Sequence, residues 1–327
     1  MKKGSKIIIG GLVLFALLVA GYMYVDSLLF DGVRPKAVNE NGFQANYFAK
    51  EGIEDQPTLI LIGGGDWGNY WGQKMGRADY AALSLPYHRR EGLPDLIEGI
   101  PLEYFERAID WLKEQPAVNP DKIVVMGASR NAELALVIAS YFPESVHGVI
   151  GYCPSSVSWS NTIHPFNSDE LKPSWTFRNE AVPFIPMEKM KGGESNRVNT
   201  LAYATEGLSD SSTVATASIQ VEKINGPILL FSGLDDEVWP AAIMSDMIEE
   251  RINKRGFDFS FDNIQYEDAG HLISGNPDFP PTMRQGKLMI DGKRYEYNFG
   301  GTVEGDMNAQ KDASKRVFDF LSKMRNE

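Results

Sequence analysis

Short, continuous apolar runs alternate with helical segments along most of this 327-residue chain. Runs without polar alternation are typical of strands that are buried on both faces of a parallel sheet. Strands and helices that alternate in this way predict an α/β fold with a mainly parallel sheet. The candidate strands are residues 57–65, 79–87, 121–127, 146–154, 226–233 and 257–271.

Helices are expected between and after these strands. Apolar side chains recur at helical spacing over residues 100–116. Gly256 closes a second segment, residues 240–256, and residues 311–325 form a closing helix. Residues 155–222 do not fit the alternation, because they are rich in Ser, Asn, Thr and Pro and lack a clean period. We interpret them as a lid or cap insertion, with a long decorating loop as the alternative.

The N-terminal segment has the pattern of a membrane-targeting sequence. Lysines at positions 2, 3 and 6 precede residues 7–25, which carry no charge. At about 1.5 Å per residue, a helix over this stretch would span roughly 28 Å, close to the thickness of a bilayer's hydrocarbon core. The lysines before it and Asp26 after it place the N-terminus inside and the rest of the chain outside.

Two interpretations of this segment stay open. The nearest match to a signal-peptidase site, Val19-Ala20-Gly21, is poor, which favours a retained anchor over a cleaved signal peptide. Residues 1–26 are expected to be an anchor or a signal peptide. Residues 27–327 are expected to form one domain outside the membrane, either anchored or secreted.

The composition disfavours several kinds of partner and site. The chain has 32 basic and 44 acidic residues, and its net charge of −12 disfavours nucleic acid and anionic membrane surfaces. The single cysteine, Cys153, excludes an internal disulfide and a cysteine-based metal cluster. With four histidines in the whole chain, a His-rich metal site is also unexpected. We therefore expect neither a metal nor a cofactor.

A candidate nucleophile stands in the stretch "VVMGASRNAELAL", residues 124–136. A serine between a buried strand and a helix exposes its hydroxyl at the carboxyl end of the sheet, and the next backbone N–H, here that of Arg130, points to the same place. Asn131 occupies the position where such turns usually have glycine. Ser129 is thus either a nucleophile or a helix cap.

A serine nucleophile needs a histidine base and a carboxylate that orients the base. Of the four histidines, His271 stands at the end of the last predicted strand, and we expect it to be the base. The acid should follow an earlier strand, and three acidic residues follow strand 226–233. The order Ser, Asp, His is the one expected of α/β-hydrolases. The acidic candidates are Asp235, Asp236 and Glu237.

The rest of the expected site surrounds this triad. The Arg130 amide and one amide of the glycine-rich loop within residues 62–72 are expected to bind an oxyanion, and Gly65 and Asp66 are the loop candidates. The loop is not a phosphate-binding P-loop, because it lacks the Gly-Lys-Ser/Thr ending. Candidate substrate contacts, each with a structural or solvated role as the alternative, are Trp67, Arg89, Arg90 and Trp239.

Several of these motifs resemble one family. Residues 91–156, "GLDDEVWP" (233–240), "AGHLI" (269–273) and residues 299–321 closely resemble the C-terminal domain of acyl-CoA thioesterases and bile acid-CoA:amino acid N-acyltransferases. The resemblance covers roughly residues 55–325. It implies an α/β-hydrolase fold and a triad of a Ser or Cys nucleophile with Asp and His. Carried over, these roles fall on Ser129, Asp236 and His271.

The resemblance also implies a reaction. A serine nucleophile favours hydrolysis of acyl thioesters or esters over transfer to an amino acid. A carboxylesterase or peptidase on the same scaffold and a catalytically inactive binding module are the alternatives. The sequence departs from the family at Asn131, in its leading apolar segment, and in residues 27–54, which are too few for the N-terminal β-sandwich of the animal enzymes.

Overall fold

The computed structural model describes every residue except 1–2, 164–167, 169 and 327. Its centre is an eight-stranded sheet in the order β1-β2-β4-β3-β6-β7-β10-β11. All neighbouring strands from β4 to β11 are parallel, and β1 and β2 are antiparallel additions at one edge. The strands are β1 Lys36–Glu40, β2 Phe43–Phe48, β3 Gln56–Ile62, β4 Ala81–Leu85, β6 Val118–Ala128, β7 Val149–Tyr152, β10 Ile228–Gly233 and β11 Phe261–Tyr266.

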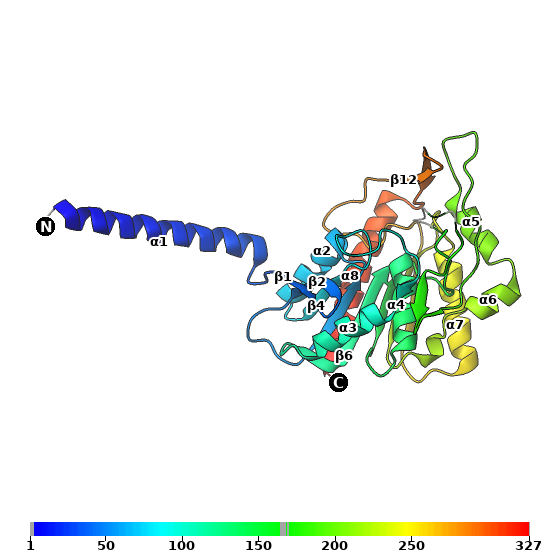
Figure 1. The fold of residues 1–327 in the computed structure, drawn as a ribbon, viewed down its shortest axis with the longest axis horizontal. Coiled ribbons are helices and arrows are strands. Elements are labelled where there is room, and N and C mark those ends of the chain that lie inside the picture. The colour runs from blue at the N-terminus through cyan, green and yellow to red at the C-terminus, as the bar shows by residue number, and fades with distance from the viewer. Residues whose placement is uncertain (1–2, 164–167, 169, 327) are drawn as a thin grey trace.

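Helices pack on both faces of this sheet (Figure 1). Successive side chains of a strand point to opposite faces. Thus Ile60 of β3 packs in one core with α3 and α4, whereas Leu61 packs in a second core with α2 and α8. The α/β prediction with a mainly parallel sheet is confirmed. The helices around the sheet are α2 Gly65–Arg77, α3 Glu103–Lys113, α4 Arg130–Tyr141, α7 Ala241–Arg255 and α8 Val303–Asn326.

The predicted loop within residues 62–72 is wrong, because α2 begins at Gly65. Gly68, Gly72 and Gly76 recur every four residues and therefore share one face of this helix. A Cβ on these residues would come within 2.4–2.5 Å of Ser84, Phe48 and Val33, so the helix lies directly on the sheet edge. The glycines that suggested a loop serve close packing instead.

Two β-hairpins were not predicted, although each has a recognisable turn. Asn41-Gly42 joins β1 to β2, and Asp291-Gly292 joins β12 to β13. All four turn residues have positive φ, as two-residue hairpin turns of this kind require. The second hairpin consists of β12 Gln285–Ile290 and β13 Lys293–Asn298.

Residues 155–222 contain short elements, which explains the lack of a clean period. The helices α5 Thr200–Gly207 and α6 Ser211–Ala217 are capped by the side chains of Asn199 and Asp210. The small strand β8 Trp175–Phe177 pairs with β5 Ile100–Pro101 and with β9 Glu180–Ala181. The 3₁₀ turn Val221–Lys223 closes the insertion. His164, one of the four histidines considered above, lies outside the described residues.

Helix α1, Lys3–Phe30, extends away from the sheet (Figure 1). Its stretch Ile8–Phe30 is long and apolar enough to cross a membrane, a test that signal sequences also pass. The helix continues past Asp26, and the backbone carbonyl of Phe30 accepts a 2.6 Å hydrogen bond from Gln73 of α2. Whether α1 is retained stays a prediction, as does the location of the domain outside the membrane.

Candidate active site

The three candidate triad residues lie at one edge of the sheet. Ser129 follows β6, Asp236 follows the turn after β10, and His271 follows β11. These strands are parallel and lie in the order β6-β7-β10-β11. Their carboxyl ends therefore face the same side, where open α/β sheets bind ligands.

Ser129 occupies a sharp turn between β6 and α4. Its φ of 58° and ψ of −126° lie outside the regions that L-residues prefer, at a cost of about 1–3 kcal/mol. Its backbone N–H donates to Tyr152, and its carbonyl accepts from the N–H groups of Ala132 and Glu133. The side chain makes no capping hydrogen bond to α4. The geometry thus favours a nucleophile at the apex of the turn over the helix-cap alternative.

Asn131 fits into this turn because its neighbours leave room for it. Gly63 lies against it, since a Cβ on Gly63 would be 2.3 Å from Asn131 Nδ2. The hydroxyl of Tyr87 donates a 2.9 Å hydrogen bond to Asn131 Oδ1. The close approach of strand and helix depends on Gly127 instead, where a Cβ would be 2.1 Å from the carbonyl oxygen of Asn131.

Asp236 is the acidic candidate that contacts the imidazole. Its Oδ2 lies 2.7 Å from Nδ1 of His271, while Asp235 and Glu237 are exposed. The second oxygen of Asp236 accepts hydrogen bonds of 2.8 and 3.2 Å from the N–H groups of Val238 and Trp239. These contacts hold the buried carboxylate in one orientation.

Trp239 connects Ser129 with the Asp236–His271 pair. Its ring lies edge-on to the imidazole of His271, with 6.2 Å between ring centroids. Trp239 and Val238 also line the same small cavity as Ser129. Trp239 therefore lies beside Ser129, and its role as a substrate contact stays a prediction.

The oxyanion candidates stand at the starts of two helices. Arg130 is the first residue of α4, and Gly65 and Asp66 are the first residues of α2. The first N–H groups of a helix have no acceptor within that helix. The preceding Gly64 has φ 57°, and a Cβ there would be 2.6 Å from the backbone nitrogen of Pro86, so this turn requires glycine. Because β3 and β6 are adjacent, the two helix starts are neighbours.

The other predicted contacts occupy different environments. Arg90 is exposed, and its Nη2 lies 3.7 Å from the point that a Cβ on Gly65 would occupy, beside the start of α2. Arg89 is also exposed, in the same turn with φ 54°. Trp67 is half-buried, and its indole N–H donates to the carbonyl of Ser274 at 3.0 Å.

Cys153 lies buried behind the candidate triad. Its Sγ is 3.6 Å from the carbonyl oxygen of His271, and burial together with the nearby Asp236 carboxylate raises the pKa of the thiol well above its usual value. The possible ligand atoms of Cys153, Asp236 and His271 lie within 4.8 Å of one another. A metal here would have to replace the Asp236–His271 contact and deprotonate this thiol, so the hydrogen-bonded arrangement is the favoured one.

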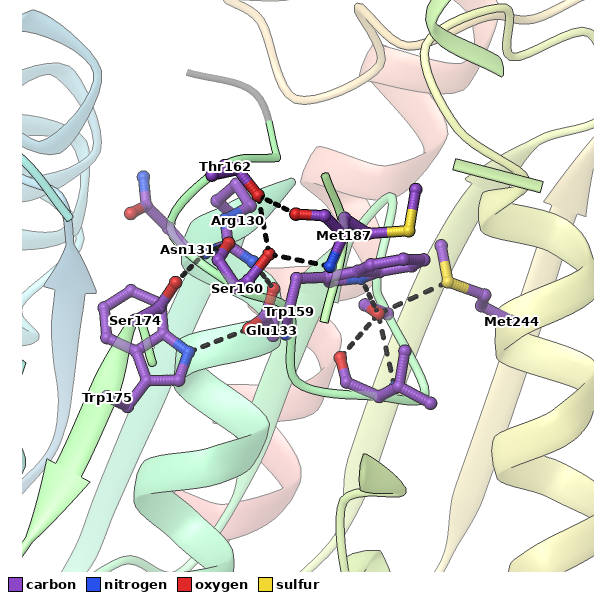
Figure 2. A network of polar contacts seen from close by, with 12 residues as sticks. Arg130, Asn131, Glu133, Trp159, Ser160, Thr162, Ser174, Trp175, Met187 and Met244 are labelled. Atoms are coloured by element: carbon purple, nitrogen blue, oxygen red, sulfur yellow. Dashed lines mark hydrogen bonds and ion pairs between the residues drawn. The ribbon is translucent and has the colours of Figure 1, made fainter. Parts of the chain in front are cut away.

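Sequence reasoning did not find the buried polar residues beneath the turn. Glu133 of α4 forms an ion pair with Arg130, and its carboxylate accepts hydrogen bonds from the Trp159 backbone and the Trp175 indole (Figure 2). A signal was present, because Glu133 lies within residues 91–156, the stretch that resembles the family. The partners lie 26 and 42 residues away, so the resemblance alone could not name them.

Comparisons with solved structures agree with this architecture. The chain superposes on MGS-M1, an α/β-hydrolase from a deep-sea metagenome, with a TM-score of 0.51 and 16% identity over 89% of this chain and 99% of that one. A dienelactone hydrolase-like phosphotriesterase from metagenomic libraries gives a TM-score of 0.50 and 12% identity, over 89% and 97%. At these identities the likeness concerns the fold, which is the α/β-hydrolase fold.

Comparisons of sequence identify the family. Mouse mitochondrial acyl-coenzyme A thioesterase 2 is 27% identical over 90% of this chain and 61% of its own length. Human acyl-coenzyme A thioesterase 6 is 25% identical over 90% and 66%. Mouse acyl-coenzyme A amino acid N-acyltransferase 2 is 25% identical over 89% and 66%. The chain thus spans just under two thirds of the length of these relatives. Residues 100–327 match the family described as BAAT / acyl-CoA thioester hydrolase C terminal, and the chain belongs to that family.

Proposed function

We propose that this protein is a serine hydrolase that cleaves acyl thioesters or esters through a covalent acyl-enzyme. The observation that carries the proposal is the 2.7 Å contact between Asp236 and His271 at the sheet edge where Ser129 occupies a strained turn. The names of the relatives, mainly acyl-coenzyme A thioesterases, support an acyl thioester as substrate.

The proposed mechanism assigns one task to each group. Asp236 accepts a hydrogen bond from Nδ1–H of His271, which leaves Nε2 unprotonated and able to act as a base. The Ser129 hydroxyl gives its proton to Nε2 and attacks the acyl carbon, and the imidazolium then protonates the departing thiolate or alkoxide, which leaves as a thiol or alcohol. Water, activated by the same histidine, releases the acid and restores Ser129.

The starts of α4 and α2 are proposed to stabilise the intermediate. The Arg130 amide and an amide of Gly65 or Asp66 donate to the oxyanion, and each donor contributes about 2.7–4 kcal/mol in comparable sites. Arg90, beside Gly65, is placed to meet an anionic group of the substrate. The proposal includes attachment to the membrane through α1, with the hydrolase domain outside the membrane. The alternative is that cleavage of the N-terminal segment releases the hydrolase domain.

A Ser129→Ala variant tests the mechanism. We expect it to lose hydrolysis of a p-nitrophenyl acyl ester and labelling by a fluorophosphonate probe, while its far-UV circular dichroism stays that of the parent protein. Turnover retained in this variant would contradict the mechanism. Absence of both labelling and turnover in the folded parent protein would instead indicate a binding module.

Substrate profiling separates the enzyme classes. An acyl thioester, the corresponding oxygen ester and a peptide substrate should be compared on the full chain in detergent. Faster turnover of the thioester supports the thioesterase assignment. Preference for the oxygen ester or the peptide would move the assignment to a carboxylesterase or a peptidase on the same scaffold.

A further inference from the structure

The cavity at Ser129 is small and mostly apolar. Its volume is about 20 Å³. Pockets for drug-sized ligands measure about 300–1,000 Å³. The space beside Ser129 is far smaller and accommodates only a small group. Its lining consists of Ser129, Ile163, Met190, Thr200, Tyr203, Ala204, Val238 and Trp239.

Most of the wall comes from the insertion, and hydrogen bonds hold it in place. The hydroxyl of Tyr203 contacts the carbonyl of Thr162 at 3.2 Å, and it also contacts the carbonyl of Glu188. The hydroxyl of Thr200 donates to the carbonyl of Glu237, next to Asp236, at 3.1 Å. Met190 packs against the β12–β13 hairpin. The wall is thus joined to the loop that carries the acid.

A buried polar network fixes the insertion to the helix that begins after Ser129 (Figure 2). The Glu133 carboxylate accepts from Trp159 N at 3.1 Å and from Trp175 Nε1 at 2.8 Å, and its ion pair with Arg130 extends to the hydroxyl of Ser174. All five residues are buried. Moving this part of the insertion away would leave buried charges without partners, which is strongly disfavoured. The network thus holds Trp159, Ser174 and Trp175 of the insertion against the start of α4.

The small size of the cavity also limits which part of the substrate enters it. A carbonyl carbon attacked by Ser129 has one acyl substituent and one leaving group. A leaving group as large as coenzyme A cannot fit in about 20 Å³ and must extend to solvent. The apolar wall beside Ser129 then faces the acyl substituent.

We propose that this chain acts on short acyl groups, acetyl or propionyl, bound in the cavity formed by Ser129, Trp239 and the insertion. The inference rests on the proposed function, because it names the acyl class for the same nucleophile. Met190, Tyr203 and Ala204 set the limit on acyl length.

The test is a series of p-nitrophenyl esters, from acetate through propionate and butyrate to hexanoate, with the full chain in detergent. We expect kcat/KM to fall by at least about 10-fold between propionate and hexanoate, since one methylene that a pocket cannot accept costs about 10-fold or more. Equal or better turnover of hexanoate would overturn the short-acyl inference alone. Loss of Ser129-dependent turnover for every ester would overturn the proposed function.

A second series varies the leaving group of acetate esters from methyl to long alkyl. Tolerance of long leaving groups supports the assignment of the cavity to the acyl side. A strict limit on the leaving group, with tolerance of long acyl groups, would reverse that assignment and contradict the inference.

Two methionine variants provide a matched comparison. Met190 lines the cavity, whereas Met187 packs beside Trp159 and Gly207, and the two are similarly buried at 6% and 8% exposure. Met190→Ala should raise the hexanoate-to-propionate ratio of kcat/KM by about 10-fold, and Met187→Ala should leave it unchanged. Equal ratios in the two variants would contradict the role of the cavity.

A second variant, which makes the cavity smaller, keeps the inference testable if Met190→Ala does not fold. Ala204→Val adds two methyl groups to another part of the lining and should reduce turnover of propionate more than that of acetate. An unchanged propionate-to-acetate ratio in a folded Ala204→Val protein would also count against the inference.

Discussion

The hydroxyl of Tyr87 donates a hydrogen bond of 2.9 Å to Oδ1 of Asn131, two residues after the candidate nucleophile. Asn131 stands where the family usually has glycine, and its side chain occupies the space beside Gly63. The larger residue is therefore compatible with the strained turn at Ser129. Its side chain has a hydrogen-bond partner, and Gly63 has no Cβ that would collide with it. Variants of Tyr87 and Asn131 therefore measure how much asparagine at this position contributes to the stability of the protein.

Restoring glycine should destabilise the protein. Asn131→Gly leaves the buried Tyr87 hydroxyl without its acceptor, and we expect a loss of about 1–3 kcal/mol in the free energy of unfolding. Urea denaturation of Asn131→Gly, Tyr87→Phe and the double variant measures the coupling. The double variant should cost less than the sum of the two single variants, and strict additivity would contradict the contact.

Replacement of Ser129 should separate activity from backbone strain. Both Ser129→Ala and Ser129→Gly remove the nucleophile, but only glycine accepts φ 58° without steric strain. We expect both variants to be inactive and Ser129→Gly to be more stable than Ser129→Ala by about 1 kcal/mol. Thermal unfolding under identical conditions provides the comparison. Equal stability of the two variants would show that the turn stores no strain.

The amide analogue of the acid should impair catalysis without unfolding the chain. Asp236→Asn keeps the shape but cannot hold His271 with Nδ1 as donor, and a drop in kcat of about 10⁴-fold is the value for a comparable triad. Asp235→Asn is the matched control, because that neighbouring carboxylate is exposed. Similar kcat values for the two variants would show that Asp236 does not orient the base.

Stability should fall in mild acid because of His88. Burial and the neighbouring Arg89 lower the pKa of His88 to about 4, whereas the unfolded chain titrates near its ordinary value of 6.5. Between these values the unfolded state binds the extra proton, so the stability present above about pH 6.5 is lost as the pH falls toward 4. His147, whose pKa burial also lowers, acts in the same direction.

Substitution of His88 isolates its share of this effect. His88→Phe keeps a ring beside Tyr87, whose centroid lies 4.8 Å away, and removes the titrating group. Urea midpoints measured from pH 4.5 to 7.5 should depend less on pH in this variant than in the parent protein. Parallel curves for the two proteins would exclude His88 as a source of the acid sensitivity.

Local sequence signals predicted the strands better than the loops. The apolar runs located β3, β4, β6, β7 and β10 because a strand buried on both faces needs apolar residues throughout. β11 differs, because its residues are half-buried or exposed. The Asn41-Gly42 and Asp291-Gly292 turns carried enough local information to predict two further hairpins, but they were overlooked. The start of α2 could not be read from its glycines, because their role depends on Ser84, Phe48 and Val33, which belong to other segments.

The sequence by itself determined the α/β class, the family, and the order of Ser129, Asp236 and His271 along parallel strands. Each of these depends on local patterns and on the rule that parallel strands end at one edge of a sheet. Only the tertiary structure decided that Asp236 lies 2.7 Å from the imidazole, that Tyr87 satisfies Asn131, and that the insertion leaves about 20 Å³ beside Ser129. These outcomes depend on distances between segments that are remote in sequence, and such distances exist only after the chain has packed.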